Sequence, residues 1–509
     1  MKVVVCATHP WNTNGYSLVM SNLVTLLAAR DDVEKIWYFG FQNVSGDQSR
    51  NKRALPAKVE VFDALAHEEP RMQGFGEELV RKYVDERDPD AVVISNDSIV
   101  VERLTAKLAE GERRYKIVVY QDLVYEHMKH RFVEQLNTRV DRVLAFTQYW
   151  KEHMQGQGVK TPIDVVKHGF DPVAKFPVDQ AVARRYFGLR PNDFIILNLN
   201  RNQPRKRWDI CMKAFAEFVS MHRGEAVKLL VGTAMSASWD LLAIYERELG
   251  KRGIPLEEGR RHLILIDAPQ RLSDEDVNIL MNCADIGITA SDGEGFGLCN
   301  FEHAALGRPQ VVSNVGGHQD FFKEGHAHLC QPAMAYYVDA SRDGVGGEAQ
   351  LINYMDMVEG MELYYSNPAL REEHGRAARK HIVGSYSWQA QADAMHAALA
   401  AAIGDTVQVA DEIDLIPDVS VIADEEPAKE PEPAAKEPAA EPEPAKEPAQ
   451  EPEPATKEPA KEDGLGVKDI QEKVAAAAPA AAPAGDGEIN DLRQQLAALT
   501  ALVEKMAAR

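Results

Sequence analysis

Apolar runs alternate with stretches of helical spacing over the first 180 residues of the chain. The first run, residues 2–8, is continuous and rich in β-branched side chains, as buried parallel strands are. A glycine-containing turn at 12–15 follows, and residues 16–30 have the spacing of a helix. Further strands are predicted at 36–39, 91–95, 116–120 and 142–146. A strand, a glycine turn and a helix in this order are typical of a doubly wound α/β domain.

A second alternation of the same kind begins near residue 194. Strands are predicted at 194–198, 227–231, 263–266, 286–290 and 309–313. Helices are predicted between them at 208–222, 238–252, 274–283 and 298–306. Ligands of such sheets bind beyond the carboxyl ends of the strands. The pattern therefore predicts an α/β protein of two Rossmann-like domains with a cleft between them.

The pattern changes after residue 403. Residues 424–462 are nearly all Glu, Pro, Ala and Lys, a composition that buries too little apolar surface to fold. We predict a disordered acidic linker over 404–486, with polyproline II character. Periodicity returns over 487–509, where apolar residues at positions 489, 492, 496, 499, 503 and 506 follow a heptad spacing. We predict an amphipathic, coiled-coil helix there, with self-association, a partner protein or no associating role as the alternatives.

Charge and cysteine content narrow the classes of function. The net charge is −22, and residues 404–509 carry 10 Lys/Arg against 25 Asp/Glu, so most of the acidity lies in the tail. An acidic chain is not expected to bind nucleic acid or an anionic membrane generally. The five cysteines are unclustered, which argues against a disulfide framework, and no apolar run approaches the ~20 residues of a membrane span. We expect a soluble, cytoplasmic protein, in the host cytoplasm if its source is viral.

The strongest chemical signal is the sequence from Ser291 to Leu298, which follows a predicted strand and opens a helix. Gly295 and Gly297 allow a ligand to approach the backbone closely, and the helix N-terminus beyond them offers free N–H groups to a phosphate. Glu294 in this turn and Glu302 in the helix are carboxylates suited to sugar and ribose hydroxyls. The alternative is a tight turn with solvated acids.

A basic cluster follows the strand at 194–198. Arg201, Arg205, Lys206 and Arg207 lie at the carboxyl end of this strand, in an otherwise acidic protein. Arginine offers a bidentate fork to phosphate and lysine a point charge. We expect Arg205 and Arg207 to be solvated, and Arg201 and Lys206 to be accessible from the cleft and to bind phosphate.

These motifs together resemble the retaining glycosyltransferases of family four, the glycosyl transferases of group 1. The resemblance is carried by Arg201-x4-Lys206, by the Glu294-x7-Glu302 pair and by the stretches 307–309 and 314–317. It covers roughly residues 1–400 and is strongest over 194–320. It implies the GT-B fold, with domains at 1–180 and 181–385 and a crossover helix at 386–403 that returns to the first domain.

The resemblance also implies roles for individual residues. Arg201 and Lys206 would stabilise the departing diphosphate, Glu294 would hold the donor sugar, and Glu302 the ribose. Gly15, in the glycine loop of the first domain, would approach the phosphate from the other side. Catalytic roles fall on Arg201, Lys206 and Glu294. The wider donor-binding set is Gly15, Arg201, Lys206, Glu294, Gly295, Phe296, Gly297, Leu298 and Glu302.

The implied activity is metal-independent transfer of a sugar from a nucleotide-diphosphate sugar to a glycan, glycoprotein or lipid-linked acceptor, with no cofactor. The pairs Asp88/Asp90 and Asp274/Asp276 are interpreted as a turn and a helix start rather than as metal ligands. Two other functions stay open, a sugar-nucleotide 2-epimerase of the same fold and a non-enzymatic sugar-binding module.

The chain departs from the family at one place. Many members have a His-Asp pair after a late strand of the first domain, whereas this chain has Gln121-Asp122. Asp122 is the candidate for binding the acceptor, and His127 and His130 are weaker candidates for supplying an imidazole.

Overall fold

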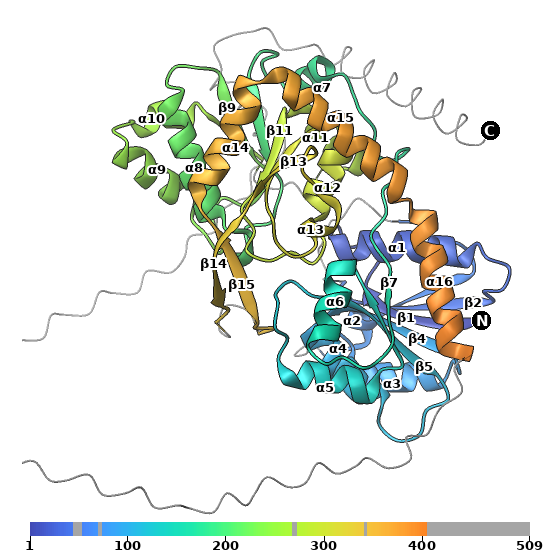
Figure 1. Ribbon diagram of the computed structural model, residues 1–509. Coiled ribbons are helices and arrows are strands. Elements are labelled where there is room, and N and C mark those ends of the chain that lie inside the picture. Colours follow the sequence, from blue (N-terminus) through green and yellow to red (C-terminus); the bar gives the residue numbers. More distant parts are fainter. Residues whose placement is uncertain (44–52, 70–73, 267–271, 340–343, 405–509) are drawn as a thin grey trace, which may run out of the picture. The chain divides into compact units, whose positions relative to one another are not determined.

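The computed structural model describes residues 1–43, 53–69, 74–266, 272–339 and 344–404 (Figure 1). The predicted linker, but for its first residue, and the predicted C-terminal helix lie outside these residues. Both sheets described below belong to one compact unit. Among the described helices, none is both long and apolar enough to cross a bilayer.

The first domain is a parallel sheet of seven strands in the order β3-β2-β1-β4-β5-β6-β7. The strands are β1 (Lys2–Thr8), β2 (Lys35–Phe41), β3 (Val59–Asp63), β4 (Ala91–Asp97), β5 (Lys116–Asp122), β6 (Arg142–Ala145) and β7 (Ile163–Val165). The helices are α1 (Gly15–Ala28), α2 (Ala64–His67), α3 (Glu77–Asp85), α4 (Ser98–Leu108), α5 (His130–Arg139) and α6 (Gln148–Gly156). All the strands predicted in this half are present, and β3 and β7 are additions.

The second domain is a parallel sheet of six strands in the order β10-β9-β8-β11-β12-β13. Its strands are β8 (Phe194–Asn198), β9 (Val227–Val231), β10 (Leu263–Leu265), β11 (Ile286–Thr289), β12 (Gln310–Ser313) and β13 (Ala327–Cys330). Its helices are α7 (Gln180–Tyr186), the 3₁₀ turn η1 (Pro204–Lys206), α8 (Trp208–Met221), α9 (Leu241–Lys251), α10 (Leu256–Arg260), α11 (Asp274–Cys283), α12 (Leu298–Ala305), α13 (His318–Phe321), α14 (Tyr354–Ser366) and α15 (Pro368–Ser385).

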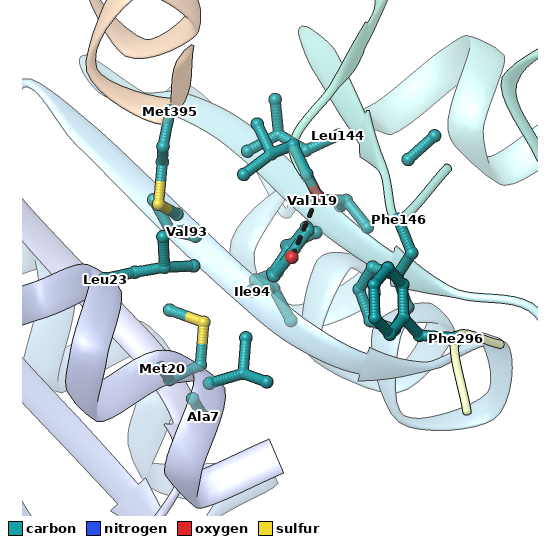
Figure 2. Packing of buried hydrophobic residues seen from close by; sticks show 14 of the residues in the cluster. Ala7, Met20, Leu23, Val93, Ile94, Val119, Leu144, Phe146, Phe296 and Met395 are labelled. Atoms are coloured by element: carbon teal, nitrogen blue, oxygen red, sulfur yellow. Dashed lines mark hydrogen bonds between the residues drawn. The ribbon is translucent and has the colours of Figure 1, made fainter. Parts of the chain in front are cut away.

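The last described helix, α16 (Trp388–Gly404), packs on the first domain rather than the second. Figure 2 shows Met395 of α16 beside Leu23 of α1 and Val93 of β4, and all three side chains are fully buried. Burying such apolar side chains stabilises a fold by about 1.5–3 kcal/mol each. The chain thus leaves the first domain after β7, builds the second and returns to complete the core of the first.

An antiparallel hairpin, β14 (Pro332–Tyr337) and β15 (Glu348–Ile352), extends from the second domain. It reaches the loop that follows β5 in the first domain. Glu126 and Glu348 exchange two backbone hydrogen bonds, of 3.2 and 2.8 Å. Val124, Tyr125, Val338 and Ala349 form a small apolar cluster beside them. The hairpin was not predicted from the sequence, and it joins the two domains beside Asp122.

Candidate functional site

The turn after β11 and the turn after β8 bring opposite charges together. Glu294 is 3% exposed and Lys206, at the end of η1, is 8% exposed. Lys206 Nζ lies 2.5 Å from Glu294 Oε1. Both strands are central in the second sheet and adjacent, so their carboxyl ends necessarily place these two turns side by side. The pairing links two of the residues predicted to be catalytic.

The cations around Glu294 hold its carboxyl group in the ionised form. Burial alone raises the pKa of Glu294, but Lys206, His318 and Arg205 outweigh burial and lower it to about 2. A buried charge is tolerated only when it is paired and hydrogen-bonded. The pair is therefore a preformed ionic centre, and Lys206 is less accessible than the sequence led us to expect.

The three arginines near Lys206 differ in their surroundings. Arg201 is exposed, so its guanidinium group is accessible to a ligand. Arg205 and Arg207 are both partly buried, so the expectation that they are solvated is wrong. Arg207 adopts a left-handed backbone, with φ of 45°, and forms a fork on Asp209 with bonds of 2.9 and 2.7 Å. Its side chain is therefore tied to the first turn of α8 and does not point into solvent.

Two helix N-termini meet beside this ionic centre. A Cβ added at Gly15, the first residue of α1, would lie 3.0 Å from Cδ1 of Leu298, the first residue of α12. Asn14 caps α1 through its side chain, and Gly297 precedes α12 with φ of 97°. Helix N-termini carry unpaired N–H groups and a partial positive charge, which favour anions. The predicted phosphate site is therefore built from both domains.

The glycines of the turn after β11 face protein rather than open space. A Cβ at Gly295 would lie 1.9 Å from Asp122 Oδ1, and one at Gly293 would lie 2.3 Å from the carbonyl oxygen of Val124. At Gly297 it would lie 2.3 Å from Nε2 of His318. We interpreted Gly295 and Gly297 as permitting the approach of a ligand. In the structure they permit the approach of the first domain and of a buried imidazole.

Asp122, the candidate acceptor residue, ends β5 and is 7% exposed. Tyr16 donates a hydrogen bond of 2.5 Å from its hydroxyl to Asp122 Oδ2, while Oδ1 is buried and accepts no hydrogen bond from the described residues. Burial raises the pKa of Asp122, although the Tyr16 bond opposes this. Gln121, in the place of the family's histidine, donates a hydrogen bond of 3.2 Å to the hydroxyl of Ser98.

The two weaker histidine candidates lie in the loop and helix beyond Asp122. His127 is exposed and pairs with Glu348 of the hairpin at 3.2 Å, and His130 is the first residue of α5. Neither contacts Asp122, Glu294 or Lys206 in any interaction described. The assignment of the acceptor to Asp122 stays a prediction.

Glu302 lies in the second turn of α12 and forms an ion pair with Lys175. It contacts neither Arg201 nor Lys206. Phe296, between the two predicted glycines, is buried and packs on His168 with ring centroids 4.3 Å apart. Figure 2 shows Phe296 against Phe146 of the first domain. Phe296 therefore joins the domains, whereas the sequence had placed it among the donor-binding residues.

Several residues of this region were not found by sequence reasoning. Trp150 of α6 donates a hydrogen bond of 2.8 Å to the carbonyl of Gly295. His318 is fully buried, and its Nδ1 donates a hydrogen bond of 3.0 Å to the Ser313 carbonyl. Trp150 lies far along the chain from Gly295, and His318 directly follows the stretch 314–317 without being part of it. Tyr16 had a sequence signal, because it follows the glycine loop directly.

The paired aspartates have structural roles, as interpreted from the sequence. Asp90 Oδ2 accepts a hydrogen bond of 2.6 Å from the Lys2 amide, and Asp276 forms a capping box with Ser273 at the start of α11. A separate group, His328, Cys330 and Asp356, has ligand atoms within 4.8 Å of one another on β13 and α14. His328 Nε2 and Asp356 Oδ1 are 2.7 Å apart, so this group also ties a strand to a helix.

Comparison with known proteins finds a family match over the second domain, which carries part of this site. Residues 179–381 match the family Glycosyl transferases group 1. A D-inositol 3-phosphate glycosyltransferase from Rhodococcus erythropolis is 32% identical over 162 residues, which is 31% of this chain and 34% of that relative. The alignment thus covers about a third of that relative's length. Within this part, it supports the resemblance to the group 1 glycosyl transferases.

Solved structures of the same kind extend the likeness to both domains. A sucrose-phosphate synthase from Thermosynechococcus elongatus matches with a TM-score of 0.60 at 15% identity, over 78% of this chain and 98% of that one. The Anabaena protein HepE, in complex with UDP and glucose, matches with a TM-score of 0.56 at 15% identity, over 79% and 100%. At this identity the likeness concerns the fold, and the predicted GT-B fold of two Rossmann-like domains is confirmed.

Proposed function

We propose that this chain is a retaining, metal-independent glycosyltransferase, which moves a sugar from a nucleotide-diphosphate sugar to a hydroxyl of a glycan, glycoprotein or lipid-linked acceptor. The observation that carries the proposal is the meeting of two helix N-termini with Lys206 and the exposed Arg201. The group 1 match over residues 179–381 supports it. The HepE complex, which holds UDP and glucose, suggests a UDP-sugar as the first donor to test.

The diphosphate is the group that this arrangement suits. When the bond between the anomeric carbon and the phosphate oxygen breaks, the electron pair leaves with the diphosphate. The developing negative charge then lies between the N-termini of α1 and α12 and beside two cations. Preorganised charges and dipoles of this kind act in the transition state without reorganising. The role of a metal ion is thereby taken by Arg201, Lys206 and the helix ends.

Glu294 would exchange partners when the donor binds. In the structure its carboxylate is paired with Lys206 at 2.5 Å. A diphosphate that attracts Lys206 frees a carboxylate oxygen of Glu294 for the hydroxyls of the donor sugar. Before the donor binds, Lys206 and Arg205 lower the pKa of Glu294 to about 2, so the carboxylate meets the donor ionised and able to accept hydrogen bonds. We assign it the role of orienting the sugar.

Asp122 would receive the acceptor. Its Oδ1, which has no hydrogen-bond partner among the described residues, would accept a hydrogen bond from the attacking hydroxyl when the contact with Gly295 opens, and Tyr16 fixes the other oxygen. The hydroxyl attacks the anomeric carbon from the side of the leaving group, and its proton passes to the departing phosphate oxygen. The configuration of the sugar is retained.

A donor screen by hydrolysis tests the proposal. UDP-glucose is assayed first, then other UDP-, GDP- and ADP-sugars, by release of the nucleoside diphosphate and by NMR of the sugar product. We expect slow release of one nucleoside diphosphate and, with an acceptor, a product of retained anomeric configuration. A sugar that is epimerised while still attached to its nucleotide would indicate the epimerase instead. Binding of saccharide without turnover of any donor would indicate a binding module.

A further inference from the structure

The carboxylate of Glu302 is held by a lysine that belongs to neither sheet. Lys175 lies in the segment between β7 and α7, which connects the two domains, and its Nζ pairs with Glu302 Oε2. The two side chains are only 15% and 13% exposed. An ion pair shielded from water to this degree is screened little by salt, and removing one partner is costly. The pair is therefore a fixed feature of the site.

The backbone around Lys175 is itself locked to the second domain. The amide of Phe176 donates to Asn278 Oδ1 at 3.2 Å, and the amide of Val178 donates to Asn282 Oδ1 at 2.9 Å. Asn282 returns a hydrogen bond of 3.1 Å to the Phe176 carbonyl. Both asparagines lie on α11 and are buried. The lysine consequently reaches Glu302 from a fixed position.

The contact with Lys175 gives the two oxygens of the Glu302 carboxylate different surroundings. A carboxylate accepts hydrogen bonds at both oxygens, and Lys175 occupies Oε2. Oε1 would then be the oxygen left to accept a hydrogen bond from a ligand hydroxyl, in an orientation set by the Lys175 contact. On the proposed function, that ligand is the ribose of the donor nucleotide.

We propose that Lys175 is a positioning residue for ribose: it fixes the Glu302 carboxylate so that Oε1 accepts a hydrogen bond from a ribose hydroxyl. The inference rests on the proposed function. It adds that ribose recognition depends on the segment between the domains, a part of the chain that carries none of the predicted motifs. A residue acting in this way changes the affinity for ribose hydroxyls and not the affinity for phosphate.

Deoxynucleotides separate these two contributions. The binding of UDP, GDP and ADP to the full chain is measured by calorimetry, and the tightest of the three is compared with its 2′-deoxy and 3′-deoxy analogues. We expect the wild-type chain to bind the ribonucleotide about 10–100-fold more tightly than the analogue that lacks the hydroxyl bound by Glu302, as for a hydrogen bond to a charged group. The same measurements are made on Lys175→Met, Lys175→Arg, Glu302→Gln and the double variant Lys175→Met/Glu302→Gln.

The inference predicts that Lys175→Met weakens the ribonucleotide about 10-fold and leaves the deoxy analogue nearly unchanged. Lys175→Arg keeps most of the discrimination, because an arginine can hold the same oxygen. The double variant binds no more weakly than Glu302→Gln alone, because Lys175 acts through Glu302. Lys35→Met, which breaks an exposed ion pair with Glu60 at the edge of the first sheet, is the matched control and changes nothing.

Two results would overturn the inference without touching the proposed function. One is equal weakening of the ribonucleotide and its deoxy analogue in a Lys175→Met chain that unfolds at the wild-type temperature. The other is a wild-type chain that binds the nucleotide without discriminating the ribose hydroxyls. If Lys175→Met fails to fold, Lys175→Gln is measured in its place. A chain that binds none of the three nucleoside diphosphates refutes the proposed function itself.

Discussion

The two edges of the site are built in different ways. The second domain contributes charges from two short stretches, 201–207 and 291–302, each following a central strand. The first domain contributes separate residues from distant elements: Tyr16 from α1, Asp122 from β5 and Trp150 from α6. The first arrangement leaves a motif in the sequence. The second leaves isolated residues, which come together only when the chain has folded.

The two edges also differ in how they hold a carboxylate. Glu294 of the second domain is buried among cations, and its pKa is lowered to about 2. Asp122 of the first domain is buried beside a neutral tyrosine, and its pKa is raised. The first case suits ionic binding of a charged donor. The second suits a hydrogen bond to a neutral acceptor, and the two surroundings therefore agree with the proposed division of donor and acceptor between the domains.

The largest expected effect comes from the cations of the second domain. Lys206→Ala and Arg201→Ala should each lower turnover by roughly 10²-fold or more, because each removes charge stabilisation of the leaving group. Only Lys206→Ala should also destabilise the fold, by about 3 kcal/mol, since it leaves Glu294 buried without its partner. Kinetics and urea unfolding of both variants test this. Equal stability of the two variants would contradict the buried pair.

The first domain should respond more selectively. Asp122→Asn removes the charged acceptor of a hydrogen bond without changing side-chain size, so transfer to an acceptor should fall about 10-fold or more. Slow hydrolysis of the donor should stay within a few-fold of the wild type. Tyr16→Phe should have the same selectivity and a smaller effect. An equal fall in hydrolysis would place Asp122 on the donor side and remove the division between the domains.

The junction between the domains should be sensitive to acid. His168 lies between Phe146 and Phe296, and burial lowers its pKa to about 3 from an ordinary value of 6.5. The folded state thus binds fewer protons than the unfolded state between these values, so the stability due to neutral His168 is complete above pH 6.5 and is lost as pH falls toward 3. His168→Phe should reduce this loss by about 2 kcal/mol between pH 7 and 5.

Urea midpoints of wild type and His168→Phe at pH 7, 6 and 5 provide the measurement. His303 of the second domain has a pKa lowered to about 3 by burial as well, so part of the pH dependence should remain in the variant. Identical slopes in the two proteins would show that His168 is not the group that titrates.

A smaller effect is expected from the C-terminal segment. Deleting residues 404–509 should leave the activity of each catalytic unit nearly unchanged, and should convert an oligomer into a monomer or abolish attachment to a partner. Light scattering and kinetics on the full and shortened chains measure both. Loss of activity on deletion would contradict the linker prediction, and two monomeric chains without a partner would contradict the association prediction.

No effect is expected from chelation. Activity should persist in excess EDTA, because Arg201, Lys206 and the helix N-termini supply the positive charge at the diphosphate. Loss of activity that manganese or magnesium restores would replace this mechanism with a metal-dependent one. Zinc restoring the activity would direct attention to His328, Cys330 and Asp356.

The regular part of the fold could be predicted from the sequence. The bounds of β1, β8, β9 and α11 agree with the prediction. The three strands are short, mainly apolar runs, and α11 begins with acidic residues directly after its cap, Ser273. β3 and β7 were missed because they are short edge strands of mixed polarity. The hairpin of β14 and β15 was missed for another reason: it is stabilised by contacts with residues 123–126, which sequence patterns do not show.

The candidate site was predictable to the extent that its groups are contiguous. Lys206 and Glu294, both predicted from the sequence as catalytic, are neighbours in space, since both follow central strands of one sheet. Lys175 and His318 were not found, because each approaches its partner through a tertiary contact. Arg207 was misjudged because its left-handed backbone turns the side chain onto Asp209.

The return of α16 to the first domain has a consequence for how the protein is made on the ribosome. Residues 1–165 emerge first and include every strand of the first sheet. Helix α16 follows some 220 residues later, and its Met395 and Leu399 are fully buried against this domain. Throughout that interval the newly made sheet exposes the apolar surface that α16 will cover (Figure 2). Chaperones and neighbouring nascent chains can bind this surface. A translation pause before residue 388 would prolong this exposure.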